Sequence, residues 1–145
     1  MPAGLLPDEG IGDQLEYILK RSIGGVLPWQ LMFFVNDITP NSATVLDDLE
    51  EATWEGYSRL TMDRDQWTTP TVHSGCAHST WGTEAVVWYV NGGPVETIYG
   101  YAYVDTSAGV IRFVQRFDPE DIRPIEVGGK VLLLPEYTLT SAECP

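Results

Sequence analysis

Basic residues are scarce in this chain. Only 8 lysines and arginines stand against 21 aspartates and glutamates among 145 residues, which gives a formal net charge of −13. Affinity for a phosphate backbone needs clustered lysine and arginine, and an anionic membrane surface repels an acidic protein. The composition therefore predicts neither nucleic acid nor a membrane as a partner.

Long hydrophobic runs are also missing. The longest candidate, residues 31–35, has the length of a strand, whereas a membrane-spanning helix needs about 20 apolar residues. The first residues lack the basic start and the apolar run of a secretory signal, so we expect synthesis in a cytoplasm. A hydrophobic fraction of 43% and an aromatic fraction of 11% argue against intrinsic disorder.

Cysteine is rare as well, with Cys76 and Cys144 as the two examples. Two distant thiols are not a disulfide framework, so we expect both to be free. Cys76 lies between His73 and His78, but a closed zinc site needs about four ligands and the spacing differs from that of the common zinc knuckles. We therefore expect no metal site and no cofactor.

Catalytic motifs are not found in the sequence. Gly10-Ile11-Gly12 follows no predicted strand, and neither a phosphate-binding loop nor a Gly-X-Ser-X-Gly nucleophile elbow occurs. The neighbouring carboxylates at 47–48 and 50–51 are typical of a solvated acidic face. The chain is predicted not to be an enzyme, and a small hydrolase using carboxylates or zinc is the least favoured alternative.

The first clear structural pattern is an amphipathic helix over residues 8–23. Asp8 can cap its first turn, apolar residues follow at helical spacing, and Gly24-Gly25 ends it. Its apolar stripe can bind a partner or pack on its own domain, and the sequence leaves both open.

After residue 28 the pattern changes to strands. β-forming runs occur at 29–35, 56–62, 84–90, 95–104, 110–117, 122–127 and 130–139, separated by turn residues. Gly128-Gly129 predicts a hairpin, and Gly100 a bulge or a close contact. This spacing predicts an all-β sandwich or barrel. We favour a jelly-roll-like sandwich over residues 29–145, preceded by an N-terminal arm and helix at residues 1–28.

Three tryptophans, Trp54, Trp67 and Trp81, lie in or near predicted loops. Exposed indole faces can stack on sugar rings, which would make the chain a glycan-binding module. Indoles also fill thin sandwich cores and subunit interfaces, and this second interpretation is the favoured one.

Several short motifs occur in a familiar order. They are LPDEG at 6–10, a strand ending in NDITP at 36–40, EATWEGY at 51–57 and TIYGY at 97–101, followed by a closing strand at 131–140. The series resembles small structural proteins of tailed bacteriophages, which serve as capsid decoration (cement) proteins or as tail and fibre parts. The polar segment 63–83 departs from that pattern.

The resemblance implies a non-enzymatic decoration protein on the outer capsid surface of a virion. Such a protein stabilises the head by bridging the major capsid protein lattice, and it commonly forms a homotrimer. The arm and helix would carry the partner interface through Leu5, Leu6, Ile11, Leu15, Ile18 and Leu19. The alternative is a tail-fibre or baseplate module that binds host glycans through the exposed tryptophans.

Overall fold

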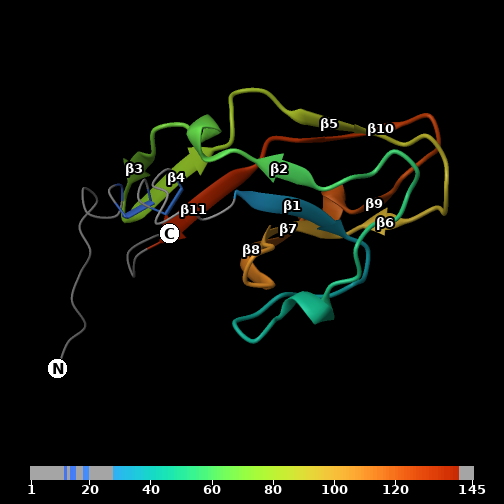
Figure 1. The fold of residues 1–145 in the computed structure, drawn as a ribbon, viewed down its shortest axis with the longest axis horizontal. Helices are drawn as coiled ribbons and strands as arrows, with labels where there is room; N and C mark the ends of the chain where they lie inside the picture. Colours follow the sequence, from blue (N-terminus) through green and yellow to red (C-terminus); the bar gives the residue numbers. More distant parts are fainter. Residues whose placement is uncertain (1–11, 13, 16–17, 20–27, 141–145) are drawn as a thin grey trace. The chain divides into compact units, whose positions relative to one another are not determined.

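The computed structural model (Figure 1) describes residues 12, 14, 15, 18, 19 and 28–140. This part of the chain is built mostly from strands in several antiparallel sheets, so the prediction of a β-rich fold is confirmed. None of its helices is long and apolar enough to cross a membrane. The strands are β1 (Trp29–Phe34), β2 (Leu60–Met62), β3 (Thr71–His73), β4 (Cys76–Thr80), β5 (Val86–Tyr89), β6 (Thr97–Ile98), β7 (Gly100–Asp105), β8 (Val110–Arg116), β9 (Arg123–Pro124), β10 (Lys130–Leu133) and β11 (Glu136–Thr140), with short 3-10 helices η1 (Leu46–Asp48), η2 (Arg64–Gln66) and η3 (Pro119–Asp121).

The chain divides into two compact units. The first unit comprises residues 1–25, 63–86 and 134–145, and the second comprises residues 26–62 and 87–133. This division differs from the expected boundary at residue 28, because the polar segment 63–83 and the last strand belong with the N-terminal segment.

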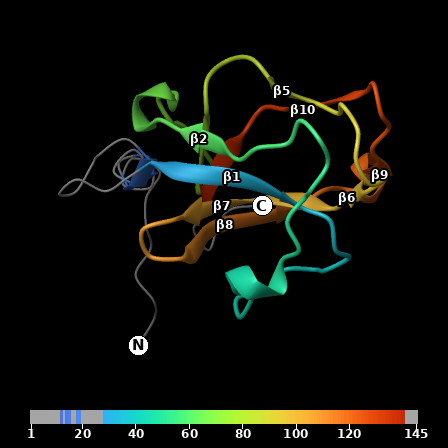
Figure 2. The same cartoon turned by 45° about the vertical axis from the view of Figure 1, so that its right-hand side comes forward.

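A four-stranded antiparallel sheet of order β2-β1-β7-β8 forms the centre of the second unit (Figure 2). Strand β1 pairs with β7 along its length, with Leu31 opposite Tyr103 and Phe33 opposite Tyr101. Side chains alternate between the two faces of a strand, yet five of the six residues of β1 are buried. Both faces of this sheet are therefore covered.

One face of the sheet is aromatic. The rings of Phe33 and of Trp88 from β5 pack edge to face, with their centroids 4.8 Å apart, and Tyr103 stacks on Phe113 at 5.0 Å. The indole N–H of Trp88 donates a hydrogen bond to the carbonyl of Ser58. Strand β5 is thereby fixed over this face.

The opposite face is aliphatic and is covered by the loop that follows β1. Met32, Phe34 and Ala102 form a buried cluster with Val104 and Leu49, against which Ile38 and Leu46 of the loop pack. A run of β-forming residues that is apolar at every position, such as 31–35, suits a strand buried on both sides.

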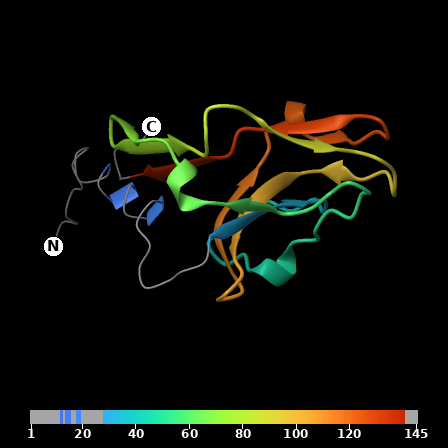
Figure 3. The ribbon, with the colours of Figure 1, turned by 45° about the horizontal axis from the view of Figure 1, so that its top comes forward.

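The first unit contains a three-stranded antiparallel sheet of order β11-β4-β3 (Figure 3). Cys76 lies opposite His73 on β3 and opposite Thr140 on β11. The described positions between 12 and 19 have helical backbone, but most of residues 8–23 lie outside the described residues, so the helix stays a prediction.

The expected hairpin at Gly128-Gly129 is wrong. The flanking strands pair elsewhere, β9 with β6 and β10 with β5. Gly128, with φ +86°, donates to the carbonyl of Val90, whose N–H donates to the carbonyl of Gly129. This is the pattern of a bulge with glycine in the left-handed region, and it fixes the start of β10 against β5.

Of the two features expected at Gly100, a bulge or a close contact, the structure has the close contact. A Cβ at this residue would collide with the ring of Phe34 and the carbonyl of Gln115. The register shift in the β7–β8 pair lies instead between Tyr103 and Val104.

Candidate docking surface

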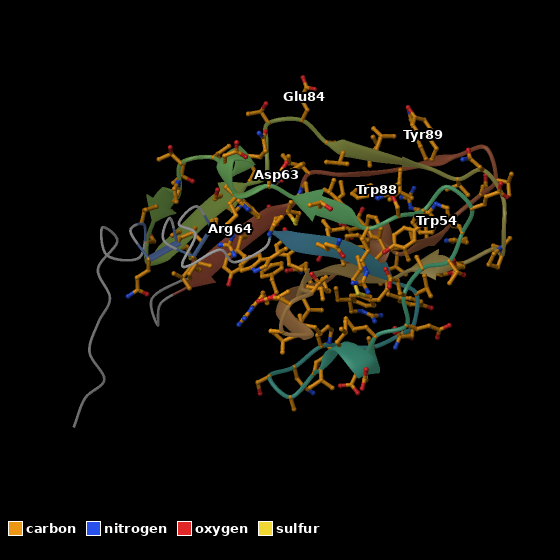
Figure 4. The ribbon with its side chains drawn as sticks, viewed as in Figure 1. Trp54, Asp63, Arg64, Glu84, Trp88 and Tyr89 are labelled. Carbon is orange, nitrogen blue, oxygen red and sulfur yellow. The ribbon has the colours of Figure 1, made fainter. Side chains whose placement is uncertain are left out.

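Strands β5 and β10 form a two-stranded ribbon with an apolar outer face. Trp88 is buried beneath the ribbon, whereas Val87, Tyr89 and Leu132 are 38%, 62% and 56% exposed. Figure 4 shows Tyr89 and Trp88 on opposite sides of β5. Val127, in the turn before β10, is 64% exposed. We call Val87, Tyr89, Val127 and Leu132 the ribbon patch.

A groove of about 790 Å³ adjoins the ribbon. Its apolar lining includes Val90, Ile98 and Ile125, which are buried. Arg123 and Lys130 also line it, together with the acidic side chains of residues 121 and 126. The groove therefore combines an apolar floor with charges of both signs.

The two basic residues of the groove differ in their ion pairing from the arginines of the central sheet and its loops. Arg59, Arg112 and Arg116 each bond a carboxylate, on Glu51, Asp105 and Asp37 respectively, at 2.7–2.8 Å. Within the described part of the chain, Arg123 and Lys130 form no ion pair. Arg123 instead donates from Nε to the carbonyl of Glu120 at 3.1 Å.

An acidic cluster lies beside the groove at η3. One carboxylate oxygen each of Asp118, Glu120 and Asp121 lies within 4.8 Å of the others, and all three residues are exposed. Surface carboxylates commonly lie this close without an ion, so the cluster does not establish a metal site.

The segment with His73, Cys76 and His78 was considered as a zinc site in the sequence analysis, and its contacts in the structure are of another kind. Cys76 is disulfide-bonded, so the expectation of a free thiol is wrong for this residue, and its sulfur is not available as a thiolate ligand. His78 pairs instead with Glu136, with 2.9 Å between Nε2 and Oε2. Cys144 lies outside the described residues.

The tryptophans considered for glycan stacking are largely enclosed. Trp54 and Trp67 are 2% and 3% exposed, and the indole of Trp54 donates to the carbonyl of Tyr89 at 3.2 Å. Trp81 is half-buried and donates to the carbonyl of Asp63. Trp54 and Trp67 therefore offer no free ring face, which agrees with the favoured interpretation of these indoles as filling residues.

The expected interface on the helix also needs correction. Leu15 and Leu19 are 0% and 1% exposed within this chain, so they are not presented to a neighbouring subunit. Ile18 is half-buried, and its carbonyl accepts a hydrogen bond from Arg64. The remaining three residues, Leu5, Leu6 and Ile11, lie outside the described residues.

The EATWEGY motif has a structural role. The carboxylate of Glu51 accepts bonds from both Nε and Nη2 of Arg59 at 2.8 Å and from the hydroxyl of Tyr57 at 2.7 Å. These bonds from Arg59 hold the pKa of Glu51 below its usual value, while burial raises the pKa of Tyr57. Gly56, with φ +100°, allows close approach to the carbonyl of Tyr89. The motif thus secures the loop that packs on the aromatic face.

Sequence reasoning missed the ribbon patch. The residues of β5, Val-Val-Trp-Tyr, are apolar throughout, so no alternation distinguishes the buried Trp88 from the exposed Val87 and Tyr89. The packing of Trp88 against Phe33 of β1, together with its bond to Ser58, determines which side faces outward.

No protein-family model, curated protein or solved structure matches this chain.

Proposed function

We propose that the chain is a non-enzymatic capsid decoration protein of a tailed bacteriophage and that the ribbon patch is its contact with the major capsid protein lattice. The observation that carries this proposal is the concentration of Val87, Tyr89, Val127 and Leu132 on and beside one two-stranded ribbon. Contiguous exposed apolar side chains on a small acidic protein are typical of a protein interface. The partner, the major capsid protein lattice, is inferred from the motif series that resembles phage structural proteins.

The ribbon is well supported for such a role. Trp88 packs against Phe33 and bonds Ser58 directly beneath the patch, so the exposed side chains stand on a rigid base. Burial of apolar surface contributes about 25 cal/mol per Å². One such contact is weak, but three in a homotrimer would add by avidity.

The charge of −13 suits the outer capsid surface, because like charges repel the chain from packaged DNA. In this proposal the β-rich body is a jelly-roll-like sandwich, synthesised in the host cytoplasm and added to the head from outside. We propose the contact surface on the ribbon and not on the apolar stripe of the helix, because Leu15 and Leu19 are buried in this chain.

The test is binding to heads of the encoding phage that lack this protein. Leu132→Asp places a charge in the patch, whereas Val110→Asp makes the same change at a 39% exposed position on β8. We expect at least about tenfold weaker binding for the first variant and little change for the second, since burying an unpaired charge is costly. Equal binding of both variants would remove the patch from the contact, and no binding of the wild type would reject the proposed function.

The alternative of a glycan-binding tail module has less support. It needs an exposed indole, and Trp54 and Trp67 are buried. Glycan binding by the wild type that is lost in Trp81→Ala would nevertheless favour it over decoration.

A further inference from the structure

We propose that Asn91 is a site of spontaneous deamidation, at which water converts the chain with time to aspartyl and isoaspartyl forms. Asn91 lies shortly after the end of β5 and directly before Gly92. The atom that attacks an asparagine side chain in this reaction is the backbone nitrogen of the next residue. Glycine leaves that nitrogen unhindered, because it has no Cβ. The inference goes beyond the proposed function and does not depend on it.

The other two asparagines of the chain have side chains held by hydrogen bonds. Nδ2 of Asn36 donates to the carbonyl of Asp48, and its Oδ1 accepts a bond from the N–H of Glu50. Oδ1 of Asn41 accepts a bond from the N–H of Ala43. Each of these side chains would have to break a bond before it could rotate toward the following peptide nitrogen.

Asn91 differs from both in its surroundings. It is exposed, and its side-chain amide forms no hydrogen bond within the described part of the chain. Its backbone N–H donates to the carbonyl of Glu55 at 2.8 Å, and the N–H of Glu55 donates to the carbonyl of Gly92 at 3.0 Å. These bonds lie on either side of the Asn91–Gly92 peptide group, whose own N–H and carbonyl form none among the described residues. The attacking nitrogen is therefore free of a competing partner.

The reaction needs only water as a second reactant. The nitrogen of Gly92 bonds to Cγ of Asn91, its proton leaves with the side-chain amide as ammonia, and a five-membered imide remains. Water then adds to one of the two imide carbonyls and breaks its bond to nitrogen. One direction of opening gives aspartate, and the other gives isoaspartate, in which the main chain runs through the former side chain.

Either product disturbs the contact between the end of β5 and the loop at residues 55–57. Isoaspartate adds one methylene to the main chain between positions 91 and 92, so the two backbone bonds with Glu55 cannot both be kept. Each product also adds a carboxylate close to that of Glu55, whose Oε2 lies 2.7 Å from the place that a Cβ on Gly92 would take. Because like charges repel, we expect this loop to separate more easily from β5.

The chemistry is tested by mass spectrometry on the purified chain, stored at mildly alkaline pH. Trypsin places Asn91 in the peptide 65–112 and the other two asparagines in the peptide 22–59. We expect position 91 to gain one mass unit at least about tenfold faster than position 36 or 41, and faster at alkaline than at acidic pH. Equal rates at the three positions, or aspartate as the sole product, would overturn the imide route.

The matched variant is Gly92→Ala. Its methyl group would meet the end of the flexible Glu55 side chain, and Gly92 is not among the residues with positive φ, so the fold is kept. We expect conversion at position 91 to become at least about tenfold slower, because a Cβ hinders the attacking nitrogen. An unchanged rate would contradict the proposal.

The structural consequence is tested by hydrogen exchange on the aged form, separated from fresh protein by its extra charge. At residues 55–57 and 89–92 we expect exchange at least about tenfold faster than in fresh protein, with β1 unchanged. Asn91→Asp carries the charge without the added methylene, and its exchange should lie between the two. Identical exchange in fresh and aged protein would overturn the effect on the loop, and a match between Asn91→Asp and the aged form would overturn the part assigned to the methylene. Neither readout involves a capsid, so a failure here is distinct from a failure of the proposed function.

Discussion

Replacing Asp105 with asparagine is expected to destabilise the β7–β8 hairpin by removing one buried charge. Asp105 is 4% exposed. Its Oδ1 accepts bonds from the hydroxyl and N–H of Ser107 and from the N–H of Ala108, and its Oδ2 accepts bonds from Nε and Nη2 of Arg112. An asparagine can keep part of the turn bonding, but it loses the charge that faces Arg112.

The size of the effect follows from the pKa of Asp105. The bonds from Ser107 and then from Arg112 hold this pKa at about 2, against an ordinary value of 3.8. That gap corresponds to about 2 kcal/mol. The Arg112 side chain is 46% exposed, and solvent screening reduces its share, so we expect Asp105→Asn to lower the free energy of unfolding by about 1–2 kcal/mol at pH 7.

The sign of the pH dependence is fixed by the lowered pKa. A carboxyl group whose pKa is lower in the folded state stabilises the fold above pH 4, and this contribution is lost as the pH falls toward 2. The difference between wild type and Asp105→Asn should therefore be constant from pH 7 to 5 and shrink below pH 4.

Urea unfolding followed by tryptophan fluorescence measures this difference. Asp37→Asn is the matched control, because Asp37 pairs with Arg116 at 2.7 Å but is 70% exposed, and we expect it to cost less than about 0.5 kcal/mol. Equal losses in the two variants, or a loss in Asp105→Asn that persists unchanged below pH 3, would refute the reasoning.

Three further predictions concern packing, a half-buried ion pair and salt. Gly100→Ala should lower the free energy of unfolding by about 1–3 kcal/mol in the same urea assay, because its methyl group would collide with Phe34 and Gln115; unchanged stability would contradict that packing. Glu51→Gln should lower the free energy of unfolding by about 1 kcal/mol at pH 7, since Glu51 and Arg59 are both about 30% exposed. This loss should be smaller below pH 4, because the pKa of Glu51 is lowered in the folded state. Added salt should strengthen self-association in sedimentation experiments by screening a charge of −13, and weaker association would indicate that basic patches dominate.

The strands of the second unit were predictable where local chemistry determines them. The β-forming run at 29–35 becomes β1, and the turn expected at 105–109 joins β7 and β8. In both places side-chain type alone favours the observed backbone, whatever the rest of the chain does.

The candidate site was not predictable in the same way, because it depends on pairings between distant segments. Trp54 lies in a loop but is buried, since its neighbours 55 and 56 bond and pack against residues 89–92. The outer face of β5 is defined by the packing of Trp88 against Phe33 of β1, which is distant in the sequence. The pairing of β11 with β4 was missed for the same reason, because nothing in the sequence indicates that residues 136–140 lie beside residues 76–80.

The central claim is that this chain is added to the outside of a phage head through the ribbon patch. The most direct measurement is an electron-microscopy reconstruction of the virion that carries it. The account predicts density for the chain on the outer capsid surface, with β5 and β10 turned toward the capsid protein. Density confined to the tail or baseplate would contradict it.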